Sequence, residues 1–472
     1  MKRSFLFLCM VSCSLIASAQ SWSDTAAAIE KIFSRYNSNS VPGAELAISR
    51  NGQVIFSKAW GMADLEHTTP LTTNSVLEAG SVSKQFTAAA ILLLEQQGKL
   101  SLDDDVRKHI PELPDYGKVI TLRHMMQHTS GLKDWGSIME LAGWGRGSRA
   151  YTNEYALYVV SKQESLNNNP GDEYIYSNSN YNLLAVIVQR VTGLTLAAFT
   201  ERNIFQPAGM KHTGWRDNYR KVVKDRAIAY SKSGQQYFTN MPNESAYGNG
   251  GLLTTAEDLL IWNQYYLSGK FGSPSLLPNQ TATRPLNNGR RNGYGAGLVT
   301  DSINGWKAIS HTGATASYRA YLEHFPEAGL SIAWLSNTSA FDNDTFNLSN
   351  AVRKLFLPDR RTARSRPANA SLDSVKAVLG DTSAANMESY VGVYYSREAE
   401  ATYNLVYKGG KLLLEIKPLF TFILTSAPKD VFNFPLGQIV FVRDGQKKVT
   451  ELKVSISRAR NVVFRKQATE VR

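Results

Sequence analysis

The sequence of 472 residues predicts a mixed domain of the α+β or α/β class, followed by a small all-β unit. Strand-like segments lie near both ends of residues 22–357, and helical patterns lie between them. That order is typical of a domain in which one sheet joins the two termini. After residue 387, apolar and polar residues alternate between glycine-rich turns, which indicates short antiparallel strands.

The first 19 residues have the features of a secretory signal peptide. Lys2 and Arg3 precede a short apolar stretch that ends in Ala17-Ser18-Ala19, so we expect cleavage before Gln20 and an exported protein, periplasmic or extracellular. The stretch is too short, and too often interrupted by serine, to span a membrane stably. Lipid attachment at Cys13 is an alternative, although the residues before it suit that modification poorly.

Composition narrows the class of function. Both cysteines, Cys9 and Cys13, lie within the expected signal, so the mature chain relies on neither disulfides nor thiol chemistry. The net charge of +12 becomes +10 without Lys2 and Arg3, because the first 19 residues contain no acid. This charge is either spread over a long basic surface or attracts an anionic cell envelope. No cluster of lysine and arginine is dense enough to predict nucleic-acid binding.

Four segments of the larger domain have clear patterns. Residues 44–64 predict a β-hairpin, because Asn51-Gly52 supplies the positive φ angles of a tight turn. An apolar helix opens at Ser81, and residues 181–193 predict a second one. Residues 318–337 predict two strands joined by a Pro-Glu-Ala-Gly turn. The strands therefore lie outside the helices in chain order.

Changes in composition predict the domain boundaries. Residues 1–19 form the signal peptide, residues 20–357 the larger domain, residues 358–386 a linker and residues 387–472 the all-β domain. The linker contains prolines and four arginines, and we expect one helix near 371–379.

Several common catalytic motifs are absent from the sequence. There is no Gly-x-Ser-x-Gly elbow, no His-Glu-x-x-His, no phosphate loop, and no paired cysteine or clustered histidine that would hold a metal. We therefore expect neither a metal nor an organic cofactor. The nucleophile must then be serine, threonine, tyrosine, lysine or a carboxylate.

Ser81 and Lys84 form a Ser-x-x-Lys pattern at the start of the apolar helix. Three residues are nearly one turn, so the lysine amine can reach the hydroxyl. Desolvation or nearby cations would lower the pKa of the amine from about 10.4 and let it accept a proton. The spacing alone is weak evidence, because residues 130–133 and 426–429 also match it, but neither segment opens a long apolar helix.

Two further motifs follow in chain order. Tyr176-Ser177-Asn178 lies just before the second helix, and His311-Thr312-Gly313 leads into a strand. Together with Ser81-x-x-Lys84, they make residues 25–355 resemble the serine penicillin-recognising hydrolases. This family includes class C β-lactamases, D-alanyl-D-alanine carboxypeptidases, D-aminopeptidases and related esterases. The tail resembles the small lipocalin-like β-barrel that follows the catalytic domain in many of these relatives.

Other copies of the short motifs, and other histidines, are interpreted as structural. Residues 151–153 and 247–249 match Tyr-x-Asn but do not lie between a Pro-Gly turn and an apolar helix. Residues 212–214 match the third motif but precede charged residues. We expect His128 to donate a hydrogen bond that shapes its loop, and His67 has no companions in metal-ligand spacing.

The resemblance implies a β-lactamase/transpeptidase-like fold of the α+β class, an α/β sandwich with a mainly antiparallel sheet, followed by a small all-β barrel domain. It also implies that Ser81 attacks an amide or ester carbonyl to form an acyl-enzyme, which water then hydrolyses. Lys84 and Tyr176 would relay the proton. Which of the two first deprotonates Ser81 stays open, because the pair is expected to titrate as a unit.

The resemblance gives the remaining residues binding roles. Asn178 would hold Lys84 and an amide of the substrate. The backbone N–H groups of Ser81 and Ala314 would form the oxyanion hole. Beside Thr312, Gly313 would let the substrate backbone approach the strand edge.

His311 departs from the pattern of class C β-lactamases, which usually have lysine at this position. The charge of a histidine depends on local pH, whereas that of a lysine is fixed. The sequence therefore favours a peptidase or esterase over a dedicated β-lactamase.

We expect a secreted or periplasmic serine hydrolase acting on D-amino-acid peptides, similar to a DD-carboxypeptidase or a D-aminopeptidase. The substrate would be a peptidoglycan-derived peptide, a β-lactam or an ester. Alternatives are a β-lactamase or carboxylesterase with the same machinery, and a penicillin-binding module that is acylated without turnover. We expect neither a nucleic-acid partner nor a membrane span, and the oligomeric state and the docking of the barrel stay open.

Overall fold

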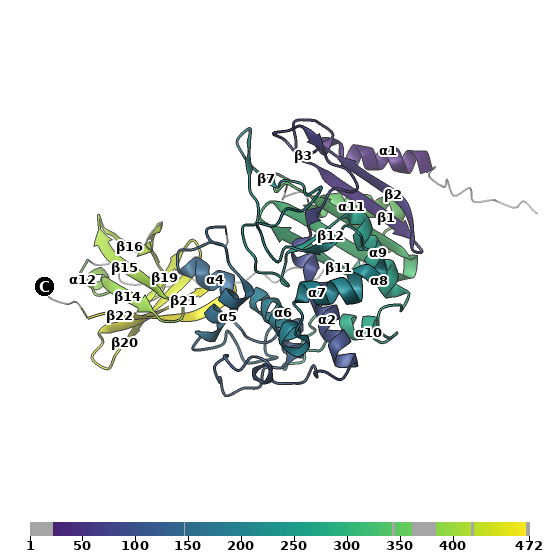
Figure 1. The fold of residues 1–472 in the computed structure, drawn as a ribbon. Coiled ribbons are helices and arrows are strands. Elements are labelled where there is room, and N and C mark those ends of the chain that lie inside the picture. The colour runs from purple at the N-terminus through teal and green to yellow at the C-terminus, as the bar shows by residue number, and fades with distance from the viewer. Residues whose placement is uncertain (1–21, 146, 342–344, 361–383, 417–419, 469–472) are drawn as a thin grey trace, which may run out of the picture.

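The protein is described by a computed structural model that covers residues 22–145, 147–341, 345–360, 384–416 and 420–468. These residues form a larger mixed domain and a smaller β domain (Figure 1). The expected signal peptide at 1–19 and the expected helix near 371–379 lie outside the described residues.

The larger domain contains α-helices along its whole length. They are α1 (Trp22–Ile32), α2 (Lys84–Gln96), α3 (Leu122–Met126), α4 (Trp135–Leu141), α5 (Asn153–Ser161), α6 (Asn178–Thr192), α7 (Leu196–Thr200), α8 (Gln206–Ala208), α9 (Ala256–Leu267), α10 (Leu276–Thr281) and α11 (Thr345–Phe356). Shorter helical turns are η1 (Ser34–Tyr36), η2 (Gly80–Ser83), η3 (Val106–Lys108), η4 (Glu201–Phe205) and η5 (Pro326–Ala328).

The strands of this domain form one large sheet and several small ones. They are β1 (Ala44–Arg50), β2 (Gln53–Trp60), β3 (Met62–Asp64), β4 (Thr69–Pro70), β5 (Leu77–Glu78), β6 (Gly214–Trp215), β7 (Tyr230–Ser233), β8 (Gln236–Thr239), β9 (Leu252–Thr254), β10 (Val299–Ile303), β11 (Trp306–Thr315), β12 (Tyr318–Phe325) and β13 (Leu330–Ser336).

The large sheet is antiparallel throughout and has the strand order β10-β11-β12-β13-β1-β2. β1 pairs with β13, from Ala44 opposite Ser336 to Arg50 opposite Leu330. The β1–β2 hairpin turns at Asn51 and Gly52, whose φ angles of 50° and 80° are both positive. This is the turn that Asn-Gly predicts, and the sheet joins the two ends of the domain as expected.

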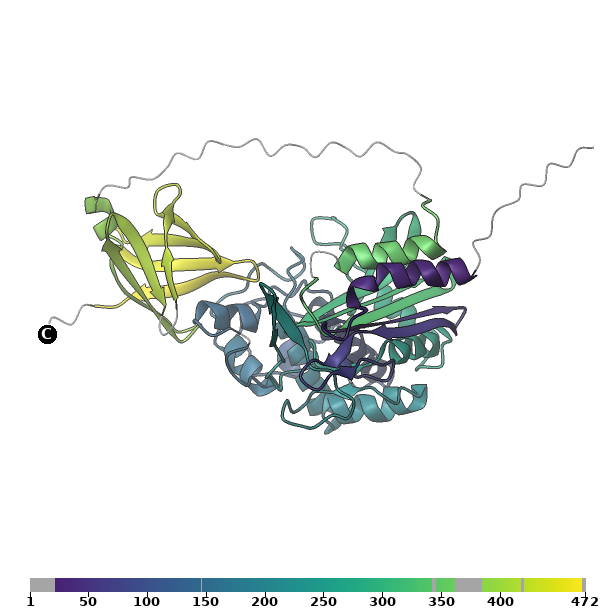
Figure 2. The ribbon, with the colours of Figure 1, turned by 90° about the horizontal axis from the view of Figure 1, so that it is seen from above.

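Helices cover both faces of the sheet. α1 and α11 lie side by side on one face (Figure 2), where Phe33, Leu46, Trp334 and Val352 belong to one buried cluster. α2 and α9 lie on the opposite face, within a larger buried cluster that also includes Leu335. The result is the predicted α/β sandwich, and its sheet is entirely antiparallel.

The two catalytic-motif helices begin differently from the prediction. The helix expected to open at Ser81 starts as the tight turn η2 and becomes α-helical only at Lys84. α6 begins at Asn178, earlier than the expected start at 181, and ends at Gly193, which adopts a left-handed conformation with φ of 73°. Both motifs therefore lie where a helix begins.

The smaller domain is a nearly closed antiparallel barrel with the order β17-β16-β15-β14-β22-β21-β20-β19-β18. Its interior contains buried side chains such as Tyr403, Phe441, Leu452 and Phe464. Its elements are α12 (Ala384–Glu388), β14 (Gly392–Ser396), β15 (Ala401–Lys408), β16 (Lys411–Ile416), β17 (Phe420–Ile423), β18 (Thr425–Ser426), β19 (Val431–Phe434), β20 (Gly437–Arg443), β21 (Val449–Ile456) and β22 (Ala459–Lys466).

The barrel is docked against the larger domain. Lys133 Nζ lies 3.1 Å from both carboxylate oxygens of Glu398, and both side chains are buried. The hydroxyl of Tyr403 donates to the carbonyl of Leu141 at 2.8 Å. At the edge of the contact, Arg465 forms a more exposed ion pair with Glu164 at 2.9 Å.

In the described ranges, no single helix has both the length and the apolar character needed to cross a membrane. One bent pair of helices, Asn178–Thr192 with Leu196–Ala208, meets these criteria jointly by length and composition only.

Candidate active site

Three side chains predicted to be catalytic meet at the start of α2. The Tyr176 hydroxyl donates to Ser81 Oγ at 2.8 Å, and Lys84 Nζ donates to the same oxygen at 3.1 Å. Ser81 and Lys84 share one helical face, while Tyr176 is supplied by the segment just before α6. The serine oxygen thus has two proton-carrying neighbours within hydrogen-bond distance.

Lys84 has no solvent exposure, and its amine is held by oxygens. Besides Ser81 Oγ, Nζ donates to Asn178 Oδ1 at 3.0 Å and to the backbone carbonyl of Asn249. These three acceptors match the three hydrogens of an ammonium group. The contact with Asn178 agrees with the expectation, whereas the segment 247–249 had been interpreted as structural and yet contributes directly to this cluster.

Tyr176 is buried, and its environment keeps its hydroxyl protonated. Burial raises the pKa of the phenol above its usual value, and the hydrogen bond to Ser81 opposes this only in part. The His128 ring packs against the phenol with 4.2 Å between the ring centroids. A buried, protonated phenol beside the serine is suited to donate a proton to a leaving group.

His128 has a structural role that differs from the one predicted. Its Nδ1 accepts hydrogen bonds, from the backbone N–H of Ser177 at 3.2 Å and from the Asn180 amide at 3.2 Å. The expectation that it donates to its loop is therefore wrong, because its partners are themselves donors. Burial lowers the pKa of His128 well below its usual value, so the ring is neutral as it supports Tyr176.

His311 is also buried and neutral. Burial, followed by the nearby charge of Lys84, lowers its pKa to about 4. Its Nδ1 lies 2.6 Å from the Thr312 carbonyl, which can only accept, so Nδ1 carries the hydrogen and Nε2 accepts from the Tyr294 hydroxyl at 2.8 Å. Tyr294 was not singled out from the sequence, and it donates to the Nε2 atom of the tautomer that the Thr312 carbonyl fixes.

Gly313 brings strand β11 against the turn that carries the serine. A Cβ at this position would lie 2.0 Å from the Ala79 carbonyl oxygen and 3.2 Å from the Ser81 backbone nitrogen. Glycine is therefore required for the approach of β11 to η2, rather than only for the approach of a substrate. Ser81, Thr312 and Ala314 all line the adjoining cavity.

The cavity beside these residues has a volume of about 650 Å³. Its lining includes five residues of the predicted site that have polar side chains (Ser81, Tyr176, Asn178, His311 and Thr312), and two arginines, Arg319 and Arg458. Seven of the eight predicted site residues lie at this cavity, and the eighth, Lys84, reaches it through Ser81 and Asn178. A small peptide or ester fits a space of this size.

The second Ser-x-x-Lys segment is not an alternative nucleophile. Ser130 is buried and donates to Asn180 Oδ1 at 2.7 Å, whereas Lys133 forms its ion pair with Glu398 of the barrel. The two side chains serve different structural contacts. The choice of Ser81 over Ser130 is thus consistent with the geometry.

Asp134 is a supporting residue that the sequence did not reveal. Its carboxylate accepts from the backbone N–H of Asn178 at 2.6 Å and from that of Ser137 at 3.0 Å. It thereby joins the start of α4 to the start of α6, which carries Asn178. No local pattern predicts such a contact, because the two segments are distant in sequence.

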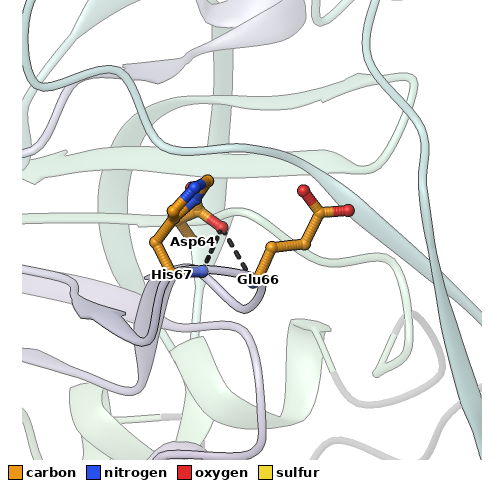
Figure 3. A group of neighbouring side chains, drawn as sticks. All are labelled: Asp64, Glu66 and His67. Carbon is orange, nitrogen blue, oxygen red and sulfur yellow. Dashed lines mark hydrogen bonds and ion pairs between the residues drawn. The ribbon is translucent and has the colours of Figure 1, made fainter.

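A second cluster of polar side chains lies at β3 (Figure 3). Asp64, Glu66 and His67 place one potential metal-ligand atom each within 4.8 Å of one another, so the expectation that His67 has no companions is wrong. However, the carboxylate of Asp64 is used locally: Oδ1 accepts from the backbone of Glu66 at 2.8 Å, and Oδ2 pairs with His67 Nδ1 at 2.7 Å. That pairing raises the pKa of His67, which favours the protonated ring over a metal ligand.

Fold and site together define a serine hydrolase that works through an acyl-enzyme. The Beta-lactamase family model matches residues 29–354, and the chain belongs to this family. It is 26% identical over 386 residues to penicillin-binding protein 4* of Bacillus subtilis, which covers 78% of this chain and 82% of that protein. It is 28% identical over 301 residues to a D-aminopeptidase of Cereibacter sphaeroides, covering 63% of this chain and 57% of that protein.

Solved structures share the fold. The octameric penicillin-binding protein homologue from Pyrococcus abyssi has a TM-score of 0.60 at 20% identity, covering 94% of this chain and 99% of its own. A D-stereospecific amidohydrolase from Streptomyces sp. has a TM-score of 0.59 at 23% identity, covering 70% of this chain and 98% of its own. The first match extends over the barrel as well as the larger domain.

Proposed function

We propose that this protein is an exported peptidase that hydrolyses amide bonds of D-amino-acid peptides through an acyl-enzyme on Ser81. The observation that carries the proposal is the cluster of Ser81, Lys84 and Tyr176, joined by bonds of 2.8 and 3.1 Å at the cavity. The names of three relatives, a D-aminopeptidase, a D-stereospecific amidohydrolase and a D-amino acid amidase, support D-amino-acid substrates.

The chemistry follows from the contacts of the serine. Ser81 Oγ attacks the carbonyl carbon when the Lys84 and Tyr176 pair has lost one proton, either as a neutral amine beside the phenol or as an ammonium beside the phenolate, and the serine proton passes to that vacant position. The backbone N–H groups of Ser81 and Ala314 stabilise the negative oxygen. Tyr176 delivers a proton to the departing nitrogen, and water then enters and releases the acid by the reverse transfers.

A neutral His311 favours a peptidase over a dedicated β-lactamase. Its pKa of about 4 leaves the ring uncharged at neutral pH, so position 311 lacks the fixed cation that lysine supplies there in class C β-lactamases. Slow β-lactam turnover and ester hydrolysis remain compatible with the same nucleophile.

Covalent labelling tests the nucleophile. A fluorescent penicillin or a fluorophosphonate, followed by mass spectrometry, should modify Ser81 in the wild type and in Ser130→Ala, but not in Ser81→Ala. Label on Ser130 would overturn the assignment.

Tyr176→Phe tests the proton donor. This variant keeps the ring packed on His128 but removes the hydroxyl, so we expect turnover to fall by roughly 10²- to 10⁴-fold. The control variant Tyr151→Phe should change turnover little.

A substrate panel tests the reaction class. We expect hydrolysis of a D-Ala-D-Ala peptide or a D-aminoacyl amide to exceed that of the L-isomers and of nitrocefin. Hydrolysis of short-chain nitrophenyl esters without any D-peptide would instead identify a carboxylesterase. An acyl burst without steady turnover on every substrate would identify a penicillin-binding module.

The N-terminal residue of the secreted protein tests export separately. If the signal peptide is cleaved as expected, the secreted protein should begin at Gln20.

A further inference from the structure

The turn between β21 and β22 brings the barrel to the active-site cavity. This turn contains Ser457 and Arg458. The backbone carbonyl of Arg458 accepts from the Asp134 N–H at 3.0 Å and from the Asn167 side-chain amide at 3.1 Å. Asp134 also holds the start of α6, so the barrel turn is anchored on the segment that positions Asn178.

The side chain of Arg458 lies in the cavity. Its guanidinium carbon is 4.8 Å from the centroid of the Tyr176 ring, and the residue is exposed and lines the space next to Ser81. In the ranges that the structure describes, no carboxylate lies within ion-pair distance of this guanidinium. Because arginine is charged at every physiological pH, the cavity contains a permanent cation supplied by the barrel.

The charges around the cavity favour an anionic substrate group. The charged residues among the described lining are Arg319 and Arg458, and no acid lines the space. Arg319 donates to the carbonyls of Ala316 and Tyr318 at 2.9 and 2.7 Å, which fixes it against the backbone where the β11–β12 turn enters β12. His311 is neutral. An ammonium group would therefore find no carboxylate here, whereas a carboxylate would find Arg458.

We propose that Arg458 binds the free α-carboxylate of the C-terminal residue that leaves when Ser81 is acylated. This inference rests on the proposed function and narrows it, because it assigns the enzyme to carboxypeptidase-type cleavage rather than to removal of an N-terminal residue. The substrate class is a short peptide that ends in a free carboxylate.

The geometry of a peptide supports the assignment. Tyr176 is placed to protonate the departing nitrogen, and its ring is the surface over which Arg458 lies. In a C-terminal residue the carboxylate carbon is two bonds from that nitrogen, about 2.5 Å away. A nitrogen at the Tyr176 hydroxyl thus brings its own carboxylate toward the guanidinium. The planar fork of arginine can then bind both carboxylate oxygens.

The reaction at this subsite is ordinary amide cleavage. The Ser81 Oγ to carbonyl carbon bond forms, the carbon to nitrogen bond breaks, and the nitrogen takes the proton from Tyr176. The departing amino acid leaves with its carboxylate unchanged, so Arg458 acts in binding and orientation and takes no part in proton transfer.

The test compares each substrate with its own carboxamide. An acyl-D-Ala-D-Ala peptide is paired with the C-terminal amide, and a depsipeptide ending in D-lactate is paired with its lactamide. We expect wild type to prefer each free acid in kcat/KM by roughly 10- to 100-fold, the scale of hydrogen bonds to charged groups. Arg458→Gln should bring this ratio close to one, mainly by slowing the free acids, and Arg458→Lys should restore part of it.

Arg460→Gln is the matched control. Arg460 lies on the same hairpin, but its guanidinium is paired with Glu173 at 3.0 Å and does not line the cavity. This variant should keep the wild-type preference. The backbone bonds of residue 458 remain in Arg458→Gln, and an unchanged melting temperature would verify that the barrel stays docked.

The outcomes separate the two proposals. An acid-to-amide ratio in Arg458→Gln equal to that of wild type, or an equal loss on acids and amides, would overturn the role of Arg458. If wild type hydrolyses the esters but no D-peptide, the proposed peptidase function fails. The lactate and lactamide pair then still decides whether Arg458 recognises the carboxylate.

Discussion

At the scale of single residues, the buried Lys84 lies near two neutral histidines, and oxygen atoms rather than imidazole rings accept its hydrogen bonds. His128 and His311 both lie near Lys84, and the charge of Lys84 contributes to the lowered pKa of each. Oxygens from Ser81, Asn178 and Asn249 accept from the amine instead. The cation is therefore stabilised by dipoles, which do not compete with it for protons.

The buried His311 predicts an acid-sensitive contribution to stability. Its pKa is about 4 in the folded protein and about 6.5 when unfolded, so the unfolded chain takes up the proton first as the pH falls. The neutral His311 therefore contributes about 3 kcal/mol to the free energy of unfolding above pH 6.5. This contribution is lost as the pH falls from 6.5 to 4. As the pH is lowered across this range, the melting temperature should fall less steeply for His311→Gln than for wild type.

The exposed His212 provides the comparison for this measurement. His212→Gln should follow the wild-type curve. Equal slopes for wild type and His311→Gln would show that the pKa of His311 does not differ between the folded and unfolded states.

At this scale Ser81, Lys84 and Tyr176 are predictable from the sequence, because each lies in a short motif with an interpretable context. Asn249, Asp134 and Arg458 are not predictable in this way. Asn249 acts through its backbone carbonyl, which any residue type could supply, and the other two act across long sequence separations. Residue type and spacing carry no information about such contacts.

At the scale of elements, the site depends on the contact between β11 and η2. Both strands of the β1–β2 hairpin and the helical stripe of α6 were predictable from periodicity and turn residues. The 3₁₀ start of the first catalytic helix was not. This turn begins at Gly80, whose φ is 49° and whose missing Cβ allows the Ala314 backbone to approach.

Gly313→Ala should disturb this contact. The added Cβ would meet the backbone of Ala79, which cannot move away as a flexible side chain would. We expect a loss of about 1–3 kcal/mol in the free energy of unfolding. Labelling of Ser81 by fluorescent penicillin should also slow by at least about 10-fold, because small displacements of a nucleophile are costly.

Gly214→Ala, in strand β6, is the control for this change, since nothing lies within 4 Å of its added Cβ. It should leave both the melting temperature and the labelling rate near wild type. Equal effects of the two substitutions would mean that the approach of β11 to η2 is not what requires glycine at 313.

At the scale of the whole molecule, the order of sheet, helices and barrel was predictable, but the docking of the barrel was not. Composition and alternation predict a separate all-β domain without indicating which of its turns faces the cavity. The contact is made by isolated side chains such as Lys133 and Glu398, which resemble ordinary surface charges in the sequence. Their burial is a property of the assembled molecule.

Glu398→Gln should weaken the docked arrangement substantially. It leaves the buried Lys133 ammonium without its counter-charge, and breaking such a pair typically costs about 3–5 kcal/mol. Arg465→Gln removes the half-exposed pair with Glu164 at the same interface and should cost less than about 1 kcal/mol. Thermal unfolding measures both.

Combining Lys133→Met with Glu398→Leu tests the reason for the loss. Replacing the pair by apolar side chains should recover much of the stability, because no unpaired charge remains. A double variant as unstable as Glu398→Gln would indicate that the hydrogen bond from Glu164 N–H to Glu398, at 2.6 Å, matters more than the ion pair.

The turn at Ser457 and Arg458 also gives the molecule a natural place for an optical reporter. Residues 20–472 contain no cysteine, and Ser457 is exposed and precedes Arg458, which lines the cavity. A Ser457→Cys variant of that part of the chain would therefore carry a single thiol, to which one fluorophore can be attached. Its emission would follow substrate entry and product departure in real time while every catalytic side chain stays unmodified.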